Sequence, residues 1–334
     1  MASVVWQGKY RKMKAILLTN TYYGRTLEIV QEELPEEFEL CFLQKQTREA
    51  LLMNIHQTDY LLAGGRLKIT REVLELADNL KMIQRSGVGL DALDLEAIKE
   101  KRIPLYVNQG VNAESVAEHT LLLILACLRR LPQIARNTKN GIWKKQEQGI
   151  QTSELYGKTV GIIGMGHAAR TLVELLRPFH VKILYYNRSK ADFEFEQNNG
   201  LEFAELKELL QSSDVLTLHC ALAEQTQNLI RSETLEMMKP GSILVNTARG
   251  GLVDTKALAD ALKSGHLAYA AMDVHETEPF PEDYPLRKLD NVILTPHIAG
   301  ITEDSFRTMM RQAFRNIECF DQGRLDEIAQ SRYL

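Results

Sequence analysis

A glycine-rich turn between an apolar run and an amphipathic segment constrains the fold of this chain more than any other feature. In TVGIIGMGHAARTLVELL, residues 159–176, the pattern Gly164-x-Gly166-x-x-Ala169 falls where a strand should give way to a helix. Gly164 permits a tight turn, Gly166 lets the backbone approach a pyrophosphate, and the small Ala169 allows helix and strand to pack closely. The free N–H groups at the start of the helix would then face the anion. A lone pattern of this kind is weak evidence, but its place between strand and helix predicts a dinucleotide site.

Short apolar runs alternate with longer amphipathic segments along most of the chain, which is typical of a parallel sheet with helical crossovers. In the first third the expected strands are AILLTN, YLLAGG, KMIQRSG and IPLYVNQG; from residue 159 they are TVGIIG, VKILYY, DVLTLHC, GSILVNTA, LAYAAMDV and NVILTPH. Six strands are the number that a full dinucleotide-binding domain requires. The sequence therefore predicts an α/β fold of two doubly wound parallel-sheet domains, one of them a Rossmann domain.

Two long helical segments set the expected domain boundaries. NAESVAEHTLLLILACLRRLP, residues 112–132, is predicted as one helix at the domain junction, with Asn112 as its N-cap and Pro132 as its end. The tail TEDSFRTMMRQAFRNIECFDQG is predicted as an amphipathic helix that returns to the first domain. We therefore expect a first domain built from residues 13–111 and 300–334, with the dinucleotide-binding domain, residues 112–299, inserted in it.

Charge and cysteine usage argue against several classes of protein. The chain has 40 Lys and Arg against 44 Asp and Glu, so nothing directs it to nucleic acid or to an anionic membrane. The four cysteines lie far apart without metal-ligand spacing, which argues against a metal site and indicates reduced thiols. The run LLLILACL is too short to span a bilayer, and the first residues, MASVVWQGKYRKMK, lack the apolar core of a secretion signal. We expect a cytoplasmic protein.

The residues after the second strand of the Rossmann series bear on which dinucleotide binds. KILYYNRSK, residues 182–190, places Asn187 roughly 20 residues beyond the turn, where such folds usually carry an acid that binds the ribose 2′-hydroxyl. An acid would repel a 2′-phosphate, whereas Asn187 does not, and Arg188, with Ser189 or Lys190, could hold it. A solvated loop with incidental charge is the alternative. The stretch favours NADPH and leaves NADH open.

Three further strand ends carry more polar chemistry than packing requires. NTARGG contains Arg249, DVHETEPF contains Asp273 and Glu278, and TPHIAG contains His297. Because ligands of open α/β sheets bind beyond the carboxyl ends of the strands, all of them should face the cleft of the glycine-rich turn. Singly, each has an ordinary explanation: a surface ion pair, a helix cap, a solvated acid or a packed histidine. Together they supply an anion clamp, a proton donor and a carboxylate that favours its charged form, beside a hydride carrier.

With these residues in view, the chain resembles a known family, the D-2-hydroxyacid dehydrogenases. Six stretches carry the resemblance in family-like order and spacing: SGVGLDALDLEA, GVNAESVAEHT, GIIGMGHAAR, MKPGSILVNTARGGLVD, AAMDVHETEP and LTPHIAG. The resemblance implies that Arg249 holds the carboxylate and keto oxygen of the substrate, that His297 is the acid/base, and that Glu278 hydrogen-bonds this histidine. The reaction that it implies is NAD(P)H-dependent reduction of a 2-oxoacid to the D-2-hydroxyacid.

The resemblance also implies the remaining contacts. It implies a flavodoxin-like first domain that binds the substrate, with backbone anchoring or loop contacts at Gly64, Gly65, Gly87, Val88 and Gly89. It implies cofactor contacts at Val88, Val116, Gly164, Met165, Gly166, His167, Ala168, Asn187, Arg188, Ser189, His219, Cys220, Ala221, Thr226, Thr247, Ala248, Arg249, Asp273, His297, Ala299 and Gly300. For Cys220, simple core packing is an equal alternative. The segment 112–132 resembles the dimer-forming region of the family, and Trp143 is a candidate to reach the partner subunit's site, although packing is the more ordinary role.

Several features narrow the substrate. Glu278 argues against formate dehydrogenase, whose histidine has a different partner, and the small residues 299–300 argue against D-lactate dehydrogenases. Phosphoglycerate dehydrogenases tend to carry an arginine where this chain has Gly64, although Arg66 and Lys68 keep a phosphate contact open. A small unphosphorylated oxoacid such as glyoxylate or hydroxypyruvate is therefore favoured. The alternatives are phosphoglycerate dehydrogenase-type activity and a catalytically silent, nucleotide-sensing corepressor, because some relatives of that kind keep the same three residues.

Overall fold

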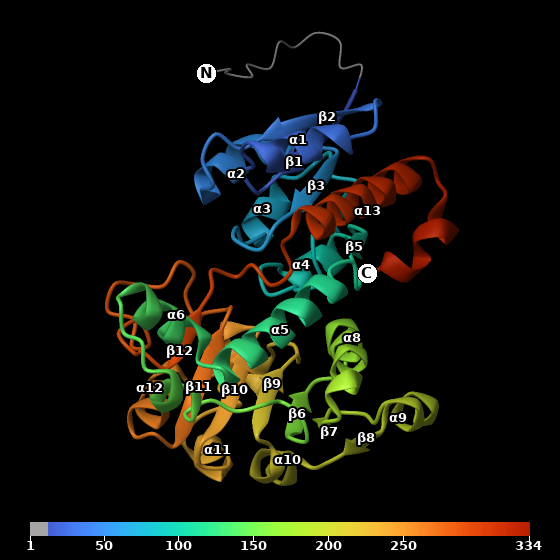
Figure 1. Cartoon of the computed structure of the whole chain (residues 1–334). Helices are drawn as coiled ribbons and strands as arrows, with labels where there is room; N and C mark the ends of the chain where they lie inside the picture. The colour runs from blue at the N-terminus through green and yellow to red at the C-terminus, as the bar shows by residue number, and fades with distance from the viewer. Residues whose placement is uncertain (1–12) are drawn as a thin grey trace. The chain divides into compact units, whose positions relative to one another are not determined.

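The structure is a computed structural model that describes residues 13–334, and these residues form two compact units (Figure 1). Unit 1 contains the described residues up to Val111 together with Glu303–Leu334, and unit 2 is the continuous segment Asn112–Thr302. The boundaries therefore fall at 111/112 and 302/303, where the sequence predicts 111/112 and 299/300. The expectation that the chain has no secretion signal concerns an amino-terminal stretch that lies mostly outside the described residues.

Unit 1 is built on a five-stranded sheet in which every neighbouring pair of strands is parallel, in the order β2-β1-β3-β4-β5. The strands are β1 (Lys14–Leu18), β2 (Phe38–Phe42), β3 (Tyr60–Ala63), β4 (Met82–Arg85) and β5 (Leu105–Val107). This is the strand order of flavodoxin-like folds. The flavodoxin-like first domain that the resemblance implies is confirmed.

Helices cover both faces of this sheet because the side chains of each strand alternate between two apolar clusters. Leu61 of β3 and Ile83 of β4 belong to one cluster, whereas Leu62 and Met82 belong to the other. The helices are α1 (Arg25–Glu32), α2 (Arg48–Asn54), α3 (Arg71–Glu75), α4 (Leu95–Glu100) and α13 (Glu303–Asp321). The carboxyl-terminal helix α13 packs on β4 and α1, so the red helix in Figure 1 completes the unit whose first strands are blue.

Unit 2 is built on a seven-stranded parallel sheet in the order β12-β11-β10-β9-β6-β7-β8. Its strands are β6 (Thr159–Ile163), β7 (Lys182–Tyr186), β8 (Leu201–Phe203), β9 (Val215–Leu218), β10 (Ser242–Asn246), β11 (Leu267–Met272) and β12 (Val292–Leu294). Counted within the unit, the first six follow the order 3-2-1-4-5-6 of a Rossmann fold, and β12 extends one edge. The strand order reverses between β6 and β9, which is where such folds bind a dinucleotide. The predicted fold class is confirmed.

Helices also cover both faces of the larger sheet. On one face, α5 (Ala113–Leu128) contacts α8 (His167–Leu176), β10 and β11. Ile243 and Val245 of β10 face this side and Leu244 faces the other, so the sheet is buried on both faces, as parallel sheets usually are. The other helices are α6 (Leu131–Lys139), α7 (Lys145–Gly149), α9 (Phe193–Asn199), α10 (Leu206–Ser212), α11 (Ser232–Met237) and α12 (Thr255–Lys263).

The structure corrects the expectation of a single helix over 112–132. Helix α5 ends at Leu128, Arg130 has a left-handed backbone with φ 48°, and Pro132 lies in the first turn of α6 instead of ending α5. Proline suits that position because the first N–H groups of a helix have no partner within it. Asn112 does occupy the N-cap position of α5, but its side chain makes no capping hydrogen bond.

Two strands were not expected from the sequence. Strand β2, FELCF, has only one buried residue and pairs with β1 alone, at the edge of its sheet. Strand β8 has three residues and lies at an edge of the larger sheet. Neither therefore produces the long apolar run that marks a central strand.

Residues 13–334 contain no helix that is long and apolar enough to cross a bilayer. The same residues contain no group of three or more His, Cys, Asp or Glu side chains that could hold a metal ion. Cys41, Cys127, Cys220 and Cys319 all lie within residues 13–334, and they form no disulfide with one another.

Candidate active site

Most of the residues singled out in the sequence lie at one edge of the seven-stranded sheet. Because all seven strands are parallel, the loops that follow them leave the sheet at the same edge. These loops carry the glycine-rich turn, Asn187–Ser189, His219–Thr226, Thr247–Arg249, Asp273–Glu278 and Thr295–Gly300. Val116, in contrast, is contributed by helix α5.

Backbone crowding explains the first glycine of the turn. Gly164 has φ +96°, and a Cβ atom there would lie 2.5 Å from the backbone nitrogen of Cys220. The turn after β6 therefore presses against the loop after β9, at the switch point of the sheet. A Cβ atom at Gly166 would meet nothing within 4 Å, and no side chain caps the helix α8 that follows. Uncapped N–H groups beside open space, with Ala169 fully buried behind them, fit a bound pyrophosphate.

The end of β7 carries no acid. Asn187 Nδ2 donates to the carbonyl oxygen of Ser189, 3.0 Å away, and closes a tight turn. Arg188 is exposed, and no hydrogen bond or ion pair with another residue of the segment 13–334 engages its guanidinium. Lys190, by contrast, lies over the ring of Phe203, with Nζ 5.1 Å from the ring centroid. Of the two cations in NRSK, Arg188 is the one available to a ligand.

The loop after β9 offers neutral groups to a neighbouring ligand. Burial lowers the pKa of His219 to about 4 and raises the pKa of the Cys220 thiol to about 11. Both side chains are therefore uncharged at neutral pH. The hydroxyl of Thr226 donates to the carbonyl oxygen of Ala221, 2.8 Å away, so the loop is closed on itself.

A buried asparagine shapes the turn that carries Arg249. Asn246, the last residue of β10, accepts from the Ala248 amide at 3.0 Å and donates to the Arg249 carbonyl oxygen at 2.9 Å. The Arg249 guanidinium donates through Nη1 to the carbonyl oxygen of Ala248, 2.7 Å away. The hydroxyls of Thr247 and of Thr120 on α5 lie 2.9 Å apart. Protein contacts therefore fix this turn on both sides.

Glu278 and His297 are in direct hydrogen-bond contact. His297 Nδ1 lies 2.7 Å from Glu278 Oε2, and the other carboxylate oxygen accepts from the His275 amide at 3.0 Å. Partial burial by itself raises the pKa of Glu278, but the hydrogen bonds from His297 and His275 outweigh it, so the pKa lies below its usual value. Glu278 is therefore an anion at neutral pH. The imidazole of His297, whose side chain is 49% exposed, keeps Nε2 for another partner.

The loop after β12 holds His297 in an uncommon backbone conformation. His297 has φ +58°, in the left-handed region that residues with a Cβ atom rarely adopt. The buried Asp273 carboxylate holds this loop, because it accepts from Thr295 Oγ1 at 2.6 Å. It also accepts from the amides of Ile298 and Ala299, at 2.9 and 2.8 Å. Asp273 thus places the loop of the histidine, and its predicted contact with the cofactor stays a prediction.

The start of α5 fixes the residues after His297. Ser115 Oγ donates to the carbonyl oxygen of Ala299, 2.8 Å away. A Cβ atom at Gly300 would lie 2.2 Å from Asn112 Nδ2 and 3.5 Å from Val116 Cγ2, so glycine is needed there. Three predicted cofactor residues, Val116, Ala299 and Gly300, are thereby brought together. The Asn112 side chain packs against Gly300 in place of capping its helix.

The predicted substrate-contacting residues of unit 1 lie on two loops, 64–65 after β3 and 87–89 after β4. The Gly64 amide donates to Thr19 Oγ1 at 2.7 Å. Arg85, the buried last residue of β4, joins the two loops: Nη1 donates to the Ala63 carbonyl oxygen at 2.8 Å and Nε to that of Gly89 at 2.6 Å. Arg85 is not among the residues predicted from the sequence, although an arginine at the end of a buried strand is in itself unusual.

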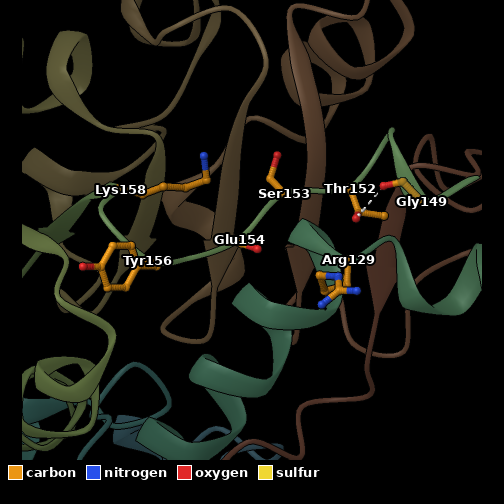
Figure 2. A pocket seen from close by; sticks show the side chains of 7 residues that line it. All are labelled: Arg129, Gly149, Thr152, Ser153, Glu154, Tyr156 and Lys158. Atoms are coloured by element: carbon orange, nitrogen blue, oxygen red, sulfur yellow. Dashed lines mark hydrogen bonds between the residues drawn. The ribbon is translucent and has the colours of Figure 1, made fainter. Parts of the chain in front are cut away.

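A hollow of about 500 Å³ in unit 2 is not this site (Figure 2). Its lining residues are Arg129, Gly149, Thr152, Ser153, Glu154, Tyr156 and Lys158. Lys158 precedes β6, so it stands at the amino end of that strand, opposite to the edge that carries the glycine-rich turn. The hollow therefore has no part in the chemistry of Arg249, Glu278 and His297.

Comparison with known proteins identifies the family. The sequence matches the family described as D-isomer specific 2-hydroxyacid dehydrogenase, NAD binding domain, over residues 121–299. It is 40% identical over 282 residues to a glyoxylate reductase of Thermofilum pendens, covering 84% of this chain and 83% of that protein. It is also 40% identical over 295 residues to a D-3-phosphoglycerate dehydrogenase of Methanocaldococcus jannaschii, covering 88% of this chain but only 55% of that longer protein.

Solved structures agree with these relatives. The NAD-dependent formate dehydrogenase from Staphylococcus aureus, solved in complex with NAD, superposes with a TM-score of 0.80 at 31% identity, covering 93% of this chain and 96% of that chain. The resemblance drawn from the six sequence stretches is confirmed. The chain belongs to the D-isomer specific 2-hydroxyacid dehydrogenase family, and unit 2 contains its nicotinamide dinucleotide-binding domain.

Proposed function

We propose that this chain reduces small 2-oxoacids to D-2-hydroxyacids with NAD(P)H. The hydrogen bond of 2.7 Å between Glu278 and His297, at the sheet edge that carries the dinucleotide turn, is the observation that carries the proposal. The similarity to a glyoxylate reductase over most of both chains supports the same class of reaction. When the dinucleotide is bound, its reduced nicotinamide supplies the hydride that the keto carbon receives.

Three side chains have separate tasks in this reaction. Arg249 binds the carboxylate and keto oxygen of the oxoacid through its fork of N–H donors. Protonated His297 donates from Nε2 to the keto oxygen as negative charge develops there, a step that contributes roughly 10²–10⁴-fold. Glu278 accepts from Nδ1 and so fixes Nε2 as the ring nitrogen that is left for the substrate. In the direction of oxidation, the same nitrogen takes the hydroxyl proton.

The proposed cofactor is NADPH in preference to NADH. Asn187 stands where an acid would bind the ribose 2′-hydroxyl and repel a 2′-phosphate. Arg188 is exposed and has no partner in the part of the chain that the structure describes. A guanidinium in that position supports phosphate binding because its paired donors match phosphate oxygens. The glycine-rich turn serves the pyrophosphate of either dinucleotide.

The proposed substrate is a small unphosphorylated oxoacid such as glyoxylate or hydroxypyruvate. Gly64, in the loop 64–65, is buried, and a Cβ atom there would lie 2.0 Å from Asn20 Oδ1. No cation can project from this position, which removes one way to bind a substrate phosphate. Arg66 and Lys68, both exposed, are the groups that phosphoglycerate dehydrogenase-type activity would use.

Oxidation of the dinucleotide, followed by its absorbance, tests the proposal. Glyoxylate, hydroxypyruvate, pyruvate and 3-phosphohydroxypyruvate are offered in turn, each with NADPH and with NADH. We expect turnover of the first two, faster with NADPH. In His297→Gln, kcat should fall by at least about 10²-fold while dinucleotide affinity is kept. Preference for 3-phosphohydroxypyruvate would favour the phosphoglycerate dehydrogenase alternative, and dinucleotide binding without any turnover would favour the nucleotide-sensing corepressor.

We also propose a homodimer, formed through the arm of residues 130–156 that follows α5. Helices α6 and α7 of this arm contain no buried residue. Trp143 and Ile150 are 82% and 87% exposed, and Leu131 and Tyr156 are also exposed. Exposed apolar side chains gathered in one segment indicate an interaction surface, and the family resemblance points to a second copy of the chain as the partner. Helix α5 itself is packed against α8 and the sheet, so the proposed interface lies mainly after the predicted segment 112–132. Four cysteines that form no disulfide with one another support a cytoplasmic location.

A further inference from the structure

A buried histidine with no task in the proposed proton transfer lies beside the catalytic pair. His275, in the loop after β11, is 6% exposed. Its amide donates to Glu278 Oε1 at 3.0 Å, so its backbone holds the carboxylate of the pair. Its imidazole Nε2 lies 3.0 Å from the carbonyl oxygen of Thr295, two residues before His297. One residue therefore contacts the carboxylate and also the backbone that leads to the acid.

The two partners of the His275 imidazole fix its protonation pattern. A carbonyl oxygen can only accept, so Nε2 must carry the proton that binds the Thr295 oxygen. The other ring nitrogen, Nδ1, lies 3.1 Å from the hydroxyl of Tyr284, which donates to it when the ring is neutral. Both nitrogens are then satisfied, as burial of a polar ring requires.

Packing holds this ring and its backbone in place. Phe280 and Tyr284 lie edge-on to the imidazole, with ring centroids 4.9 and 5.4 Å away, and they stack on each other at 4.6 Å. Both aromatic residues belong to the segment after Glu278. On the other side, a Cβ atom at Gly250 would lie 2.0 Å from the His275 carbonyl carbon, so the residue next to Arg249 also abuts this backbone. His275 thus stands where the segments of all three catalytic residues meet.

We propose that His275 is a positioning residue for His297. The left-handed backbone of His297, with φ +58°, persists only while its surroundings hold it. Asp273 holds the loop through the Thr295 hydroxyl and two amides, and His275 holds it through the Thr295 carbonyl. Loss of the His275 donor frees that carbonyl and lets the loop relax away from Glu278. Such a shift matters because proton transfer requires heavy atoms about 2.6–3.2 Å apart. The inference rests on the proposed role of His297 as the acid.

Two substitutions separate the hydrogen bond from the volume of the ring. His275→Phe keeps a ring beside Phe280 and Tyr284 but has no donor for the Thr295 carbonyl. His275→Gln keeps an N–H donor at similar reach. We expect His275→Phe to lower kcat by roughly 10–100-fold with unchanged dinucleotide affinity, and His275→Gln to restore most of that loss. His266→Phe is the matched control, because His266 Nε2 also lies 2.8 Å from a carbonyl oxygen, that of Leu235, and its loss should leave kcat unchanged.

Nitrogen-15 NMR of the full-length chain labelled in histidine gives a second readout that needs no substrate. In the wild type, His275 should show the Nε2–H tautomer. The ring-nitrogen shifts of His297, assigned with His297→Gln, should move in His275→Phe and stay in place in His266→Phe. These shifts in a protein that reduces no oxoacid would refute the proposed function and leave the positioning role standing. Unchanged shifts and kcat in His275→Phe, or equal losses in the Phe and Gln variants, would overturn the inference.

Discussion

The carboxylate of Asp273 accepts a hydrogen bond of 2.8 Å from the amide of Ala299, and it does so from a position closed to solvent. The same carboxylate accepts from Ile298 at 2.9 Å and from Thr295 Oγ1 at 2.6 Å. Asp273 lies in the loop after β11, and its buried carboxylate acts on the reaction by holding the neighbouring loop that carries His297. Its contribution should therefore appear both in stability and in turnover.

Asp273→Asn should lower both the stability of the fold and the rate of turnover. An asparagine amide turns N–H groups toward N–H donors of the loop, and a buried donor without an acceptor costs about 1–3 kcal/mol. We expect the free energy of unfolding, measured in urea, to fall by about that amount, and kcat to fall at least about tenfold. Asp290→Asn is the control, because Asp290 is exposed and pairs with Arg136 on the surface. Wild-type kcat in a destabilised Asp273→Asn protein would show that the loop does not depend on this carboxylate.

Glu278→Gln should change how stability depends on pH. Against the effect of burial, hydrogen bonds from His297 and the His275 amide keep the pKa of Glu278 below its usual value of 4.5. Such a carboxylate stabilises the fold above its unfolded pKa, and this contribution is lost as the pH falls through the folded pKa. At neutral pH, the free energy of unfolding measured in urea should be larger for the wild type than for Glu278→Gln. This difference between the two proteins should shrink below pH 4.5. A difference that stays constant down to strong acid would contradict the lowered pKa.

Much of the fold could be predicted because it depends on patterns among residues that are close in sequence. The central strands bury both faces, as Ile243 to Val245 do, and therefore produce apolar runs that stand out from amphipathic helices. The glycine-rich turn could be recognised because its backbone conformation, φ +96° at Gly164, requires glycine. The neighbouring residues also indicate the strand and the helix on either side of the turn. Edge strands such as β2 and β8 bury less and give no such signal.

The parts of the site that escaped prediction depend on residues distant in sequence. Arg85 gains its role from carbonyl oxygens on two different loops. His275 gains its role from Thr295, which no spacing rule places opposite it. The break between α5 and α6 depends on the left-handed backbone of Arg130, which the residue type does not predict. Pro132 therefore predicts the end of a helix from the sequence, although it lies in the first turn of α6. Local patterns identify the reacting groups, whereas tertiary packing decides what holds them.

Gly164→Ala should abolish dinucleotide binding. A Cβ atom there would meet the backbone of Cys220 at 2.5 Å, and backbone cannot move aside as a side chain can. Gly241→Ala is the matched control, since Gly241 also has positive φ, +79°, but its Cβ would meet nothing within 4 Å. We expect a loss of about 1–2 kcal/mol in urea unfolding for the control, with dinucleotide binding kept. Gly164→Ala should lower the free energy of unfolding more than the control does, and it should show no measurable dinucleotide affinity in a fluorescence titration. Equal stability and equal affinity of the two variants would contradict a role of the turn in dinucleotide binding.

Arg188→Asp should reverse the proposed preference for NADPH. An acid would repel the 2′-phosphate and supply the acceptor that an NAD ribose uses. A charge-assisted hydrogen bond is worth about 1.5–3 kcal/mol, so kcat/KM with NADPH should fall by roughly 10–100-fold while that with NADH changes little. Lys190→Asp changes the charge equally, but Lys190 is engaged with Phe203 and should have a smaller effect. Equal losses with both dinucleotides would show that Arg188 does not bind the phosphate.

Charges placed on the arm 130–156 should dissociate the proposed dimer. A stable interface buries about 1,200–2,000 Å². Trp143 and Ile150 are the most exposed large apolar side chains of the arm, so a partner should cover them. The double variant Trp143→Lys, Ile150→Glu should therefore sediment as a monomer at concentrations where the wild type is a dimer. Each chain should stay folded, because neither side chain belongs to the core of unit 2. Leu122→Lys, on the exposed side of α5, distinguishes an interface on the arm from an interface on α5. If only this variant dissociates the dimer, the interface lies on α5 and not on the arm.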